Sequence, residues 1–265
     1  NGTMTVQTPD LTDYNMMDAA TKLDTEWRAG LYNPASASDM NLYNRYRRNV
    51  LGGVDTYWLS KPLRTAFQHR HSASVSGGTE VFRYSLDINA AMQPGVMKES
   101  ANNTKGVNFN MSYMKEKFTM RANVSLNESN SSNSPYGSFS QYTRLNPYYI
   151  PEDANGNQQK VLDNNTVSGQ STIITNPLYD ATLGIKDLNN SLNMTTSLNL
   201  EYMVLRNLRI TEQLSYTRGM AGTDKFLPAD HTSFELEDDL TRKGSYFKST
   251  GEMASWSSNL GINYN

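Results

Sequence analysis

The sequence predicts an all-β protein: an antiparallel up-and-down transmembrane β-barrel. Of this barrel the chain would supply about seven strands, long extracellular loops and one short N-terminal helix. Three observations predict this fold: long stretches of alternating apolar and polar residues, connections that alternate between short and long, and aromatic residues near strand ends. The clearest stretch is VFRYSLDINAAM at 81–92. Its apolar and polar residues fall on opposite faces of an extended chain, because strand side chains alternate with period two.

Composition narrows the class of protein. The chain has 265 residues, a net charge of −2 and no cysteine, and only 37% of its residues are hydrophobic. A nucleic-acid partner is not expected, because such proteins carry a basic surface. No apolar run approaches the roughly 18 residues of a transmembrane helix. The composition is therefore compatible with two classes, a polar soluble β protein or a membrane β-barrel.

The chain begins with the one stretch that has helical periodicity, at 14–30. Four of its residues share one face of a helix: Met16, Ala20, Leu23 and Trp27. Gly30 stands where a glycine would end this helix. Residues 31–68 are interrupted by prolines and a glycine pair and are expected to be irregular. We therefore expect 1–68 to be an entry segment with one short helix, and 69–265 to contain the strands of the barrel.

Seven stretches after residue 68 have period two. Besides 81–92 they are 71–76, 106–114, 118–127, 192–203, 208–217 and 256–265. In a membrane barrel the apolar side of each strand faces lipid and the polar side faces the lumen. The residues predicted to face lipid are Phe82, Tyr84, Leu86, Ile88, Met92, Phe109, Met111, Tyr113, Phe118, Met120, Val124 and Leu126.

The connections between these strands alternate in length. Tight turns are expected at 77–80, 115–117 and 205–207, and long loops at about 93–105, 129–190 and 218–254. Outer-membrane barrels have this order, with short periplasmic turns and long extracellular loops. Aromatic residues beside the tight turns, such as Phe82, Tyr113 and Tyr202, fit the aromatic girdle of such a barrel. A soluble sandwich with Greek-key connections has no reason to keep this order.

Strand number predicts that the chain is a segment of a longer protein. A tilted strand crosses the hydrocarbon layer in about 9–11 residues, and all its backbone groups must pair in a closed sheet. Bacterial single-chain barrels have an even number of strands, eight or more. About seven strands cannot close in this way.

Several phrases resemble SusC-like TonB-dependent transporters of Bacteroidota outer membranes, in order and spacing, over roughly residues 10 to 265. They are GVDTYWLSKPLRTAFQHRHSASVSGG (53–78), FRYSLDINAAMQPGVMKES (82–100), NSPYGSFSQYTRLNPYY (133–149), NPLYDATL (176–183) and DKFLPADHTSFE (224–235). The combination of GVMKES, SPYGSFSQY and NPLY is the most specific part. The resemblance implies a plug domain followed by a 22-stranded barrel. In that arrangement 1–68 would be the entry segment that follows the plug, and 69–265 would be the N-terminal part of the barrel.

The same resemblance implies a function and partners. The function would be active import of a bulky nutrient across the outer membrane, usually an oligosaccharide and sometimes a peptide. A SusD-like surface lipoprotein would close over the barrel as a lid. Energy would come from TonB–ExbB–ExbD through the plug and its TonB box, neither of which is visible in this sequence. No cofactor is implied.

The long loop at 129–190 contains the candidate ligand-binding residues. They are Tyr136, Phe139, Tyr142, Tyr148, Tyr149 and Tyr179. Aromatic rings stack on the C–H faces of sugars, and nearby amides can bind the hydroxyl groups. The alternative is that these residues pack the loop itself or face the lipoprotein lid.

Other chemistry has weak support in the sequence. His69 and His71 share a strand face but lack a third ligand nearby, so no metal site is expected. No nucleophile–base–acid grouping indicates an enzyme. Two other classes stay open: a surface-exposed β-rich glycan-binding or adhesin module, whose apolar faces would have to meet in one core, and a polysaccharide-degrading enzyme, which would need paired carboxylates.

Overall fold

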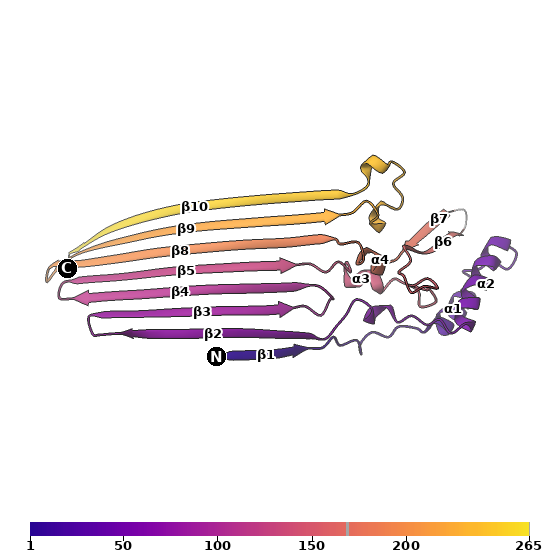
Figure 1. Ribbon diagram of the computed structural model, residues 1–265, viewed down its shortest axis with the longest axis horizontal. Coiled ribbons are helices and arrows are strands. Elements are labelled where there is room, and N and C mark those ends of the chain that lie inside the picture. Colours follow the sequence, from indigo (N-terminus) through magenta and orange to yellow (C-terminus); the bar gives the residue numbers. More distant parts are fainter. Residues whose placement is uncertain (168–169, 265) are drawn as a thin grey trace.

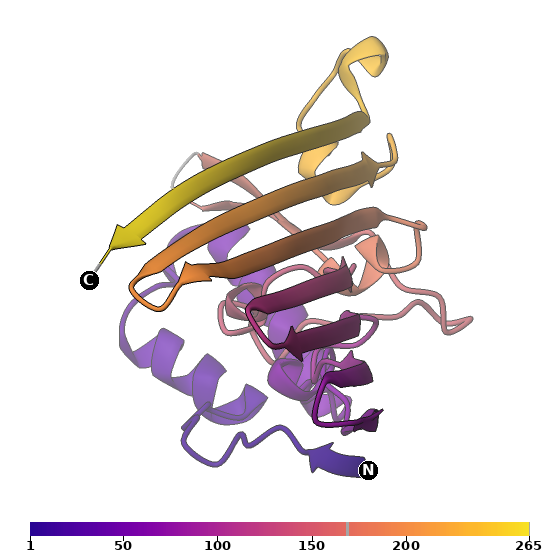
Figure 2. The same cartoon turned by 90° about the vertical axis from the view of Figure 1, so that its left-hand side faces the viewer.

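A single antiparallel sheet dominates the protein. The computed structural model describes residues 1–167 and 170–264. Eight strands pair in the order β1-β2-β3-β4-β5-β8-β9-β10, and each is antiparallel to its neighbours (Figure 1). Seen from the tight-turn end, the strands form one twisted layer with the helices behind it (Figure 2). The sheet is not closed within the described residues, and its edges are β1 and β10.

The strands are longer than the sequence pattern predicts. Their bounds are β1 Gly2–Gln7, β2 Ala66–Gly78, β3 Phe82–Pro94, β4 Ala101–Lys115, β5 Phe118–Ser132, β8 Lys186–Leu205, β9 Leu208–Leu227 and β10 Ser245–Tyr264. The antiparallel meander is confirmed, with one strand more than the predicted seven. The additional strand is β1, which pairs with β2. The region 1–68 therefore contributes a strand to the sheet.

Short and longer connections alternate as predicted, but the loop expected at about 93–105 has only the six residues 95–100. Tight turns at 79–81, 116–117 and 206–207 lie at one end of the sheet. The connections 8–65, 95–100, 133–185 and 228–244 lie at the other end (Figure 1). Residues 8–65 are thus a long connection between two paired strands.

Helices occur only in the long connections of the described chain. The two longer ones are α1 Ala19–Arg28 and α2 Ala37–Leu51. Shorter helical turns are η1 Trp58–Ser60, α3 Phe139–Tyr142, α4 Pro177–Asp180, η2 Thr232–Phe234 and η3 Leu240–Arg242. The loop 133–185 also contains the hairpin of β6 Val161–Val167 and β7 Gln170–Thr175. No helix in the described ranges is both long enough and apolar enough to span a membrane.

The prediction of a single N-terminal helix was wrong, because α2 lies in a stretch expected to be irregular. The Ser36 side chain accepts a hydrogen bond from the backbone N–H of Asp39, which caps the first turn. Gly52 follows the last turn, and Gly53 has a positive φ of 84°. The glycine pair thus ends a helix. Because α2 has only one buried residue, Tyr46, it lacks a continuous apolar stripe that the sequence could reveal.

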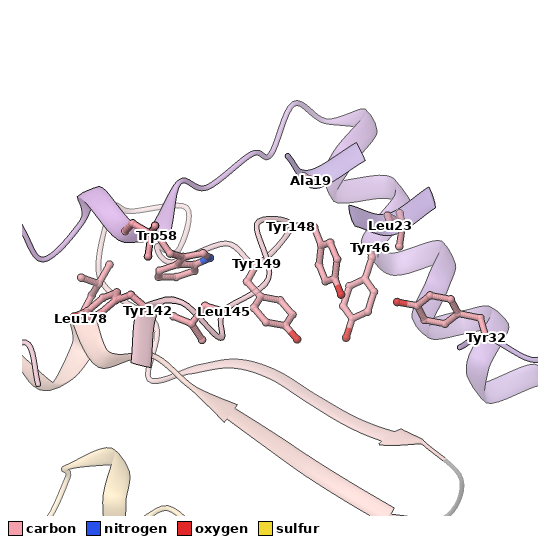
Figure 3. Close-up of a cluster of buried hydrophobic side chains, with 11 residues drawn as sticks. Ala19, Leu23, Tyr32, Tyr46, Trp58, Tyr142, Leu145, Tyr148, Tyr149 and Leu178 are labelled. Atoms are coloured by element: carbon pink, nitrogen blue, oxygen red, sulfur yellow. The ribbon is translucent and has the colours of Figure 1, made fainter. Parts of the chain in front are cut away.

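The hydrophobic core lies beyond the end of the strands. Residues 8–65 and 133–185 pack together there, and we call this unit the cap (Figure 1). Its buried core consists of Ala19, Leu23, Tyr32, Tyr46, Trp58, Leu59, Tyr142, Leu145, Tyr148, Tyr149 and Leu178 (Figure 3). Two segments distant in the sequence therefore fold as one unit on top of the sheet.

The tight turn between β2 and β3 depends on one glycine. Gly78 has φ of 134°, and a Cβ atom there would lie 2.1 Å from the carbonyl oxygen of Phe82. We expect Gly78→Ala to destabilise the full-length protein by roughly 1–3 kcal/mol, because strained backbone has a cost of this size. Thermal unfolding of the purified protein would measure it. Gly251→Ala is the matched control, since a Cβ atom at Gly251 meets nothing within 4 Å. Equal unfolding temperatures for both variants would contradict the prediction.

Candidate functional site

The strand register gives the sheet two chemically different faces. Residues directly opposite each other in an antiparallel pair share a face. Leu86 lies opposite Phe109, and Phe109 lies opposite Val124. All twelve residues predicted to face lipid lie on this apolar face. It continues across the later strands through Leu198, Leu214, Tyr216, Trp256 and Ile262.

No other part of the described chain covers the apolar face. Ile88 is 46% exposed and Trp256 is 80% exposed. Contiguous exposed apolar surface of this kind marks a protein or membrane contact. That the contact is lipid remains a prediction.

Charged residues mark the edge of an apolar band on this face. Lys105 and Glu128 lie opposite each other at the long-connection side, with Nζ and Oε2 3.9 Å apart. Arg218 and Glu252 form a second ion pair at the corresponding level, at 2.6 Å. On β5 the band runs from Phe118 to Leu126, a length that matches the roughly 9–11 residues of a membrane-crossing strand. The rest of β5, residues 127–132, extends past the band toward the cap.

One carboxylate interrupts the band. Glu212 lies on the apolar face opposite Leu200 and Leu260. Its Oε1 accepts a hydrogen bond from the hydroxyl of Ser258 at 2.7 Å. A neighbouring strand thus provides a polar partner for the one acidic side chain within the band of the described strands.

The opposite face is a continuous polar surface. Asn123 donates to Asn110 at 2.8 Å, and Asn110 donates to Ser85 at 3.2 Å, which links three strands. Ser215 and Ser257 are hydrogen-bonded in the same row at 2.7 Å. We call this side of the sheet the polar face. Its amide and hydroxyl groups suit contact with water or with a polar ligand.

The cap core contains a buried carboxylate held by tyrosines. Glu26 is 7% exposed and accepts hydrogen bonds from the hydroxyls of Tyr32 at 2.8 Å and Tyr148 at 2.9 Å. Lys22 Nζ lies 3.2 Å from the same carboxylate. The Tyr148 ring stacks on Tyr46 with centroids 4.4 Å apart (Figure 3). These contacts join α1, α2 and the loop 133–185.

A second buried carboxylate, Asp163, ties the β6–β7 hairpin to α2. It accepts hydrogen bonds from Tyr46, Arg45 and Asn165. Burial raises the pKa of the Tyr46 and Tyr148 hydroxyls above the usual range, so both stay protonated as donors. Each buried carboxylate of the cap core is therefore satisfied by hydrogen bonds.

Three predicted ligand-binding residues are part of this core. Tyr142, Tyr148 and Tyr149 are 0%, 1% and 5% exposed. Their rings offer no open face to a sugar, which corrects the prediction for these three and fits the alternative that they pack the loop. Tyr136 and Phe139 pack against the core and are partly exposed, as is Tyr179. Ligand contact by these last three stays a prediction.

Side chains from residues 49–58 hold the loop that contains Tyr148 and Tyr149. Trp58 Nε1 donates to the carbonyl of Asn146 at 2.9 Å, and Thr56 Oγ1 donates to the carbonyl of Tyr149 at 3.0 Å. Asn49 Nδ2 donates to the carbonyl of Tyr148 at 3.1 Å. The RLNPYY segment is thus fixed by residues about 90 positions earlier in the chain.

The phrase GVMKES forms the connection between β3 and β4. Arg64 donates through Nε to the carbonyl of Gly95 and through Nη2 to that of Ser100, both at 3.2 Å. Lys98 Nζ in turn donates to the carbonyl of Lys61 at 2.7 Å. The cationic side chains of Arg64 and Lys98 therefore bind backbone carbonyl groups across the junction between the cap and the sheet.

A third junction joins NPLYD to DHTSF. Asp180 is 7% exposed and accepts from Thr232 through the backbone N–H at 2.9 Å and through the hydroxyl at 2.5 Å. Lys160 and Glu235 form a 2.7 Å ion pair nearby, and the hydrogen bond to Glu235 raises the pKa of Lys160. These contacts therefore join the connection 133–185 to the connection 228–244.

Metal chemistry has no support in the described ranges. They contain no group of three or more His, Cys, Asp or Glu side chains that could hold an ion. The rings of His69 and His71 are 5.7 Å apart at their centroids.

The fold matches part of a peptide transporter of known structure. The RagAB peptide transporter superposes on 100% of this chain with a TM-score of 0.75 at 18% identity. The RagAB peptide importer matches in the "open-open" state with a TM-score of 0.73 at 18% identity, and in the "closed-closed" state with 0.68 at 15%. The chain spans 32%, 31% and 40% of those chains, respectively. No protein-family model and no curated protein matches the sequence.

We expect the Tyr148 hydroxyl to stabilise the cap. Tyr148→Phe would remove one donor to the buried Glu26 carboxylate and cost roughly 1–3 kcal/mol. Limited proteolysis of the full-length purified protein would detect this as faster cleavage within 8–65 and 133–185. Tyr43→Phe is the control, because the Tyr43 hydroxyl has no hydrogen bond within the described structure. Cleavage at the same rate in both variants would argue against the network.

The raised tyrosine pKa values predict that the cap opens in alkali. In the unfolded chain a tyrosine loses its proton near pH 10, whereas Tyr46 and Tyr148 keep theirs to higher pH in the fold. Their contribution to stability is therefore complete below about pH 10 and is lost as the pH rises above it. Proteolysis of the cap as a function of pH would measure this. A Tyr46→Phe/Tyr148→Phe variant should show a weaker alkaline dependence, and an unchanged dependence would count against this assignment.

Proposed function

We propose that this chain forms part of the barrel wall of a SusC-like TonB-dependent transporter in a bacterial outer membrane. The observation that carries the proposal is the apolar band, which is bounded by ion pairs and has a polar face behind it. In such a wall the band faces lipid, the polar face lines the lumen and the cap lies on the extracellular side. The whole transporter would import a bulky nutrient.

We propose a peptide as the nutrient. The resemblance implied an oligosaccharide more often than a peptide, and the loop aromatics were candidates to stack on sugar rings. Tyr142, Tyr148 and Tyr149, however, are buried in the cap core. The matched transporter is named a peptide transporter. The partners proposed for the whole protein are a SusD-like surface lipoprotein over the cap and TonB–ExbB–ExbD acting through a plug.

The rival classes have less support. A surface-exposed glycan-binding or adhesin module would need its apolar faces to meet in one core, yet the core of the described chain lies in the cap and the apolar face of the sheet is exposed. The matched structures are those of a transporter rather than an enzyme.

Two single arginine substitutions would test which face of the sheet contacts lipid. Leu86→Arg puts a charge on the apolar band and should cost roughly 2–4 kcal/mol near the middle of the bilayer. Ser85→Arg puts the same charge one residue away on the polar face and should have little effect, as should Asn89→Asp. The amount of full-length protein in the outer-membrane fraction of its own host would measure assembly.

Two results would contradict the proposal. One is recovery of the natural full-length protein from the soluble fraction without detergent. The other is equal assembly of the Leu86→Arg and Ser85→Arg variants. Transport itself would be tested by deleting the full-length gene, which should abolish uptake of a peptide mixture by the host.

A further inference from the structure

The apolar face of the sheet has a hollow just past the charged edge of the band. Its volume is about 1070 Å³, and residues of β4, β5, β8, β9 and β10 line it. Three rows of side chains on this face lie one above the other in the hollow. From the band toward the cap the rows are Glu128–Leu192–Met220–Glu252, Asn130–Asn190–Gly222–Thr250 and Ser132–Leu188–Asp224–Lys248.

In the proposed barrel this hollow is on the membrane side of the wall and not in the lumen. Further strands of the wall would pair with the free edges of β1 and β10, so they would not lie over the outer face of β8 and β9. A plug would lie behind the sheet, against the polar face. An occupant of the hollow therefore comes from the membrane or from another molecule.

The three rows lie at the depth of lipid headgroups. Residues two apart on a strand are roughly 7 Å apart, and a strand tilted by about 40° gains roughly 5 Å of height over that distance. The rows thus cover roughly the first 10 Å beyond the band. The headgroup layer of a bilayer is about 5–8 Å thick on each side. A lipid whose headgroup is in the hollow would have its acyl chains on the band, which continues through Leu126 and Met194.

Each carboxylate of the hollow has a cation beside it. The pairs are Glu128 with Lys105 at 3.9 Å, Glu252 with Arg218 at 2.6 Å, and Asp224 with Lys248 directly opposite. A phosphate group would add a negative charge to this balanced set. An uncharged group that both donates and accepts hydrogen bonds fits it better, and a sugar with several hydroxyls is such a group.

Two polar groups in the hollow suit sugar hydroxyls. Asn190 lies beside Gly222, where a Cβ atom would be 2.2 Å from Asn190 Oδ1. Glycine inside a strand often marks a place where a ligand or another group approaches closely. One oxygen of Asp224 is buried and accepts no hydrogen bond in the described chain, although both neighbouring strands of β9 are present. Because a buried acceptor without a donor is rare and costly, a hydroxyl donor would stabilise it.

We propose that the hollow binds the sugar headgroup of a glycolipid in the outer leaflet. The sugar hydroxyls bind Asn130, Asn190 and Asp224. The acyl chains lie over Leu192 and Met220, which are 37% and 44% exposed, and over the band beneath. This rests on the proposed function, which puts the band in the outer membrane and the cap outside, and hence the hollow in the outer leaflet. It adds a selectivity for one class of headgroup, which an ordinary lipid-facing wall lacks.

The test compares two lipids with the same acyl chains and different headgroups. Digalactosyldiacylglycerol has sugars and no phosphate, whereas phosphatidylglycerol has a phosphate and no sugar. Each is added to the full-length protein after purification in detergent and removal of bound lipid, and native mass spectrometry measures the fraction bound. We expect the wild type to bind the galactolipid about tenfold more tightly, the size of one or two net hydrogen bonds.

Two substitutions in the hollow should abolish this preference. Asn190→Leu removes the central amide, and Thr250→Trp fills the hollow from an exposed position on β10. Both variants should bind the two lipids equally. Asn193→Leu is the matched control, because Asn193 is on the same strand but on the polar face, and it also lies beside a glycine, Gly219. It should keep the wild-type preference.

The outcomes separate the inference from the proposed function. The inference is overturned if the wild type binds neither lipid, if it binds both equally, or if either hollow variant keeps the preference. It is also overturned if the wild type is a dimer that Thr250→Trp separates, because a second copy of the chain then covers the hollow. All these results leave the lipid-facing wall intact. The proposed function fails separately, through equal assembly of the Leu86→Arg and Ser85→Arg variants.

Discussion

Backbone pairing between successive strands is the constraint on which the rest of this structure depends. Each strand from β2 to β10 in the large sheet pairs along most of its length with its sequence neighbour in that sheet. That pairing fixes which side chains share a face. A slip of one residue in any strand would move its apolar residues to the polar face. Leu86, Phe109 and Val124 form one apolar row only because the register aligns them. In lipid the same pairing satisfies backbone groups that have no other partner.

The cap depends on a different kind of contact. Its segments are held by side chains that donate to backbone carbonyls far away in the sequence, such as Trp58 to Asn146 and Arg64 to Gly95. Buried tyrosines and carboxylates complete the core around Glu26 and Asp163. These junctions place the cap relative to the strands.

Much of the sheet could be predicted from sequence, because period-two alternation is a local signal and the tight turns punctuate it. The strand ends were less predictable, since polar residues beyond the band, such as Asn130 and Asn190, look like loop residues until their pairing is known. β1 was not predicted, because its six residues are far in the sequence from any alternating stretch and therefore resemble a terminal tail. The cap core was missed because Tyr148 and its partner Glu26 are 122 residues apart. A tyrosine in a polar loop resembles a ligand contact when its partners are unknown.

The strands of the sheet differ in height. β2 and β3 have 13 residues each, whereas β8, β9 and β10 have 20 each, a difference of 7 residues or roughly 23 Å along the strand. The register divides this difference unevenly. Phe82 lies level with Leu200, five residues before the end of β8, whereas Pro94 lies level with Leu188, two residues after its start. The longer strands therefore project mainly at the tight-turn end, by five residues or roughly 17 Å. The edge of the sheet beneath the cap is nearly even, and the stepped edge lies at the opposite end, away from the cap.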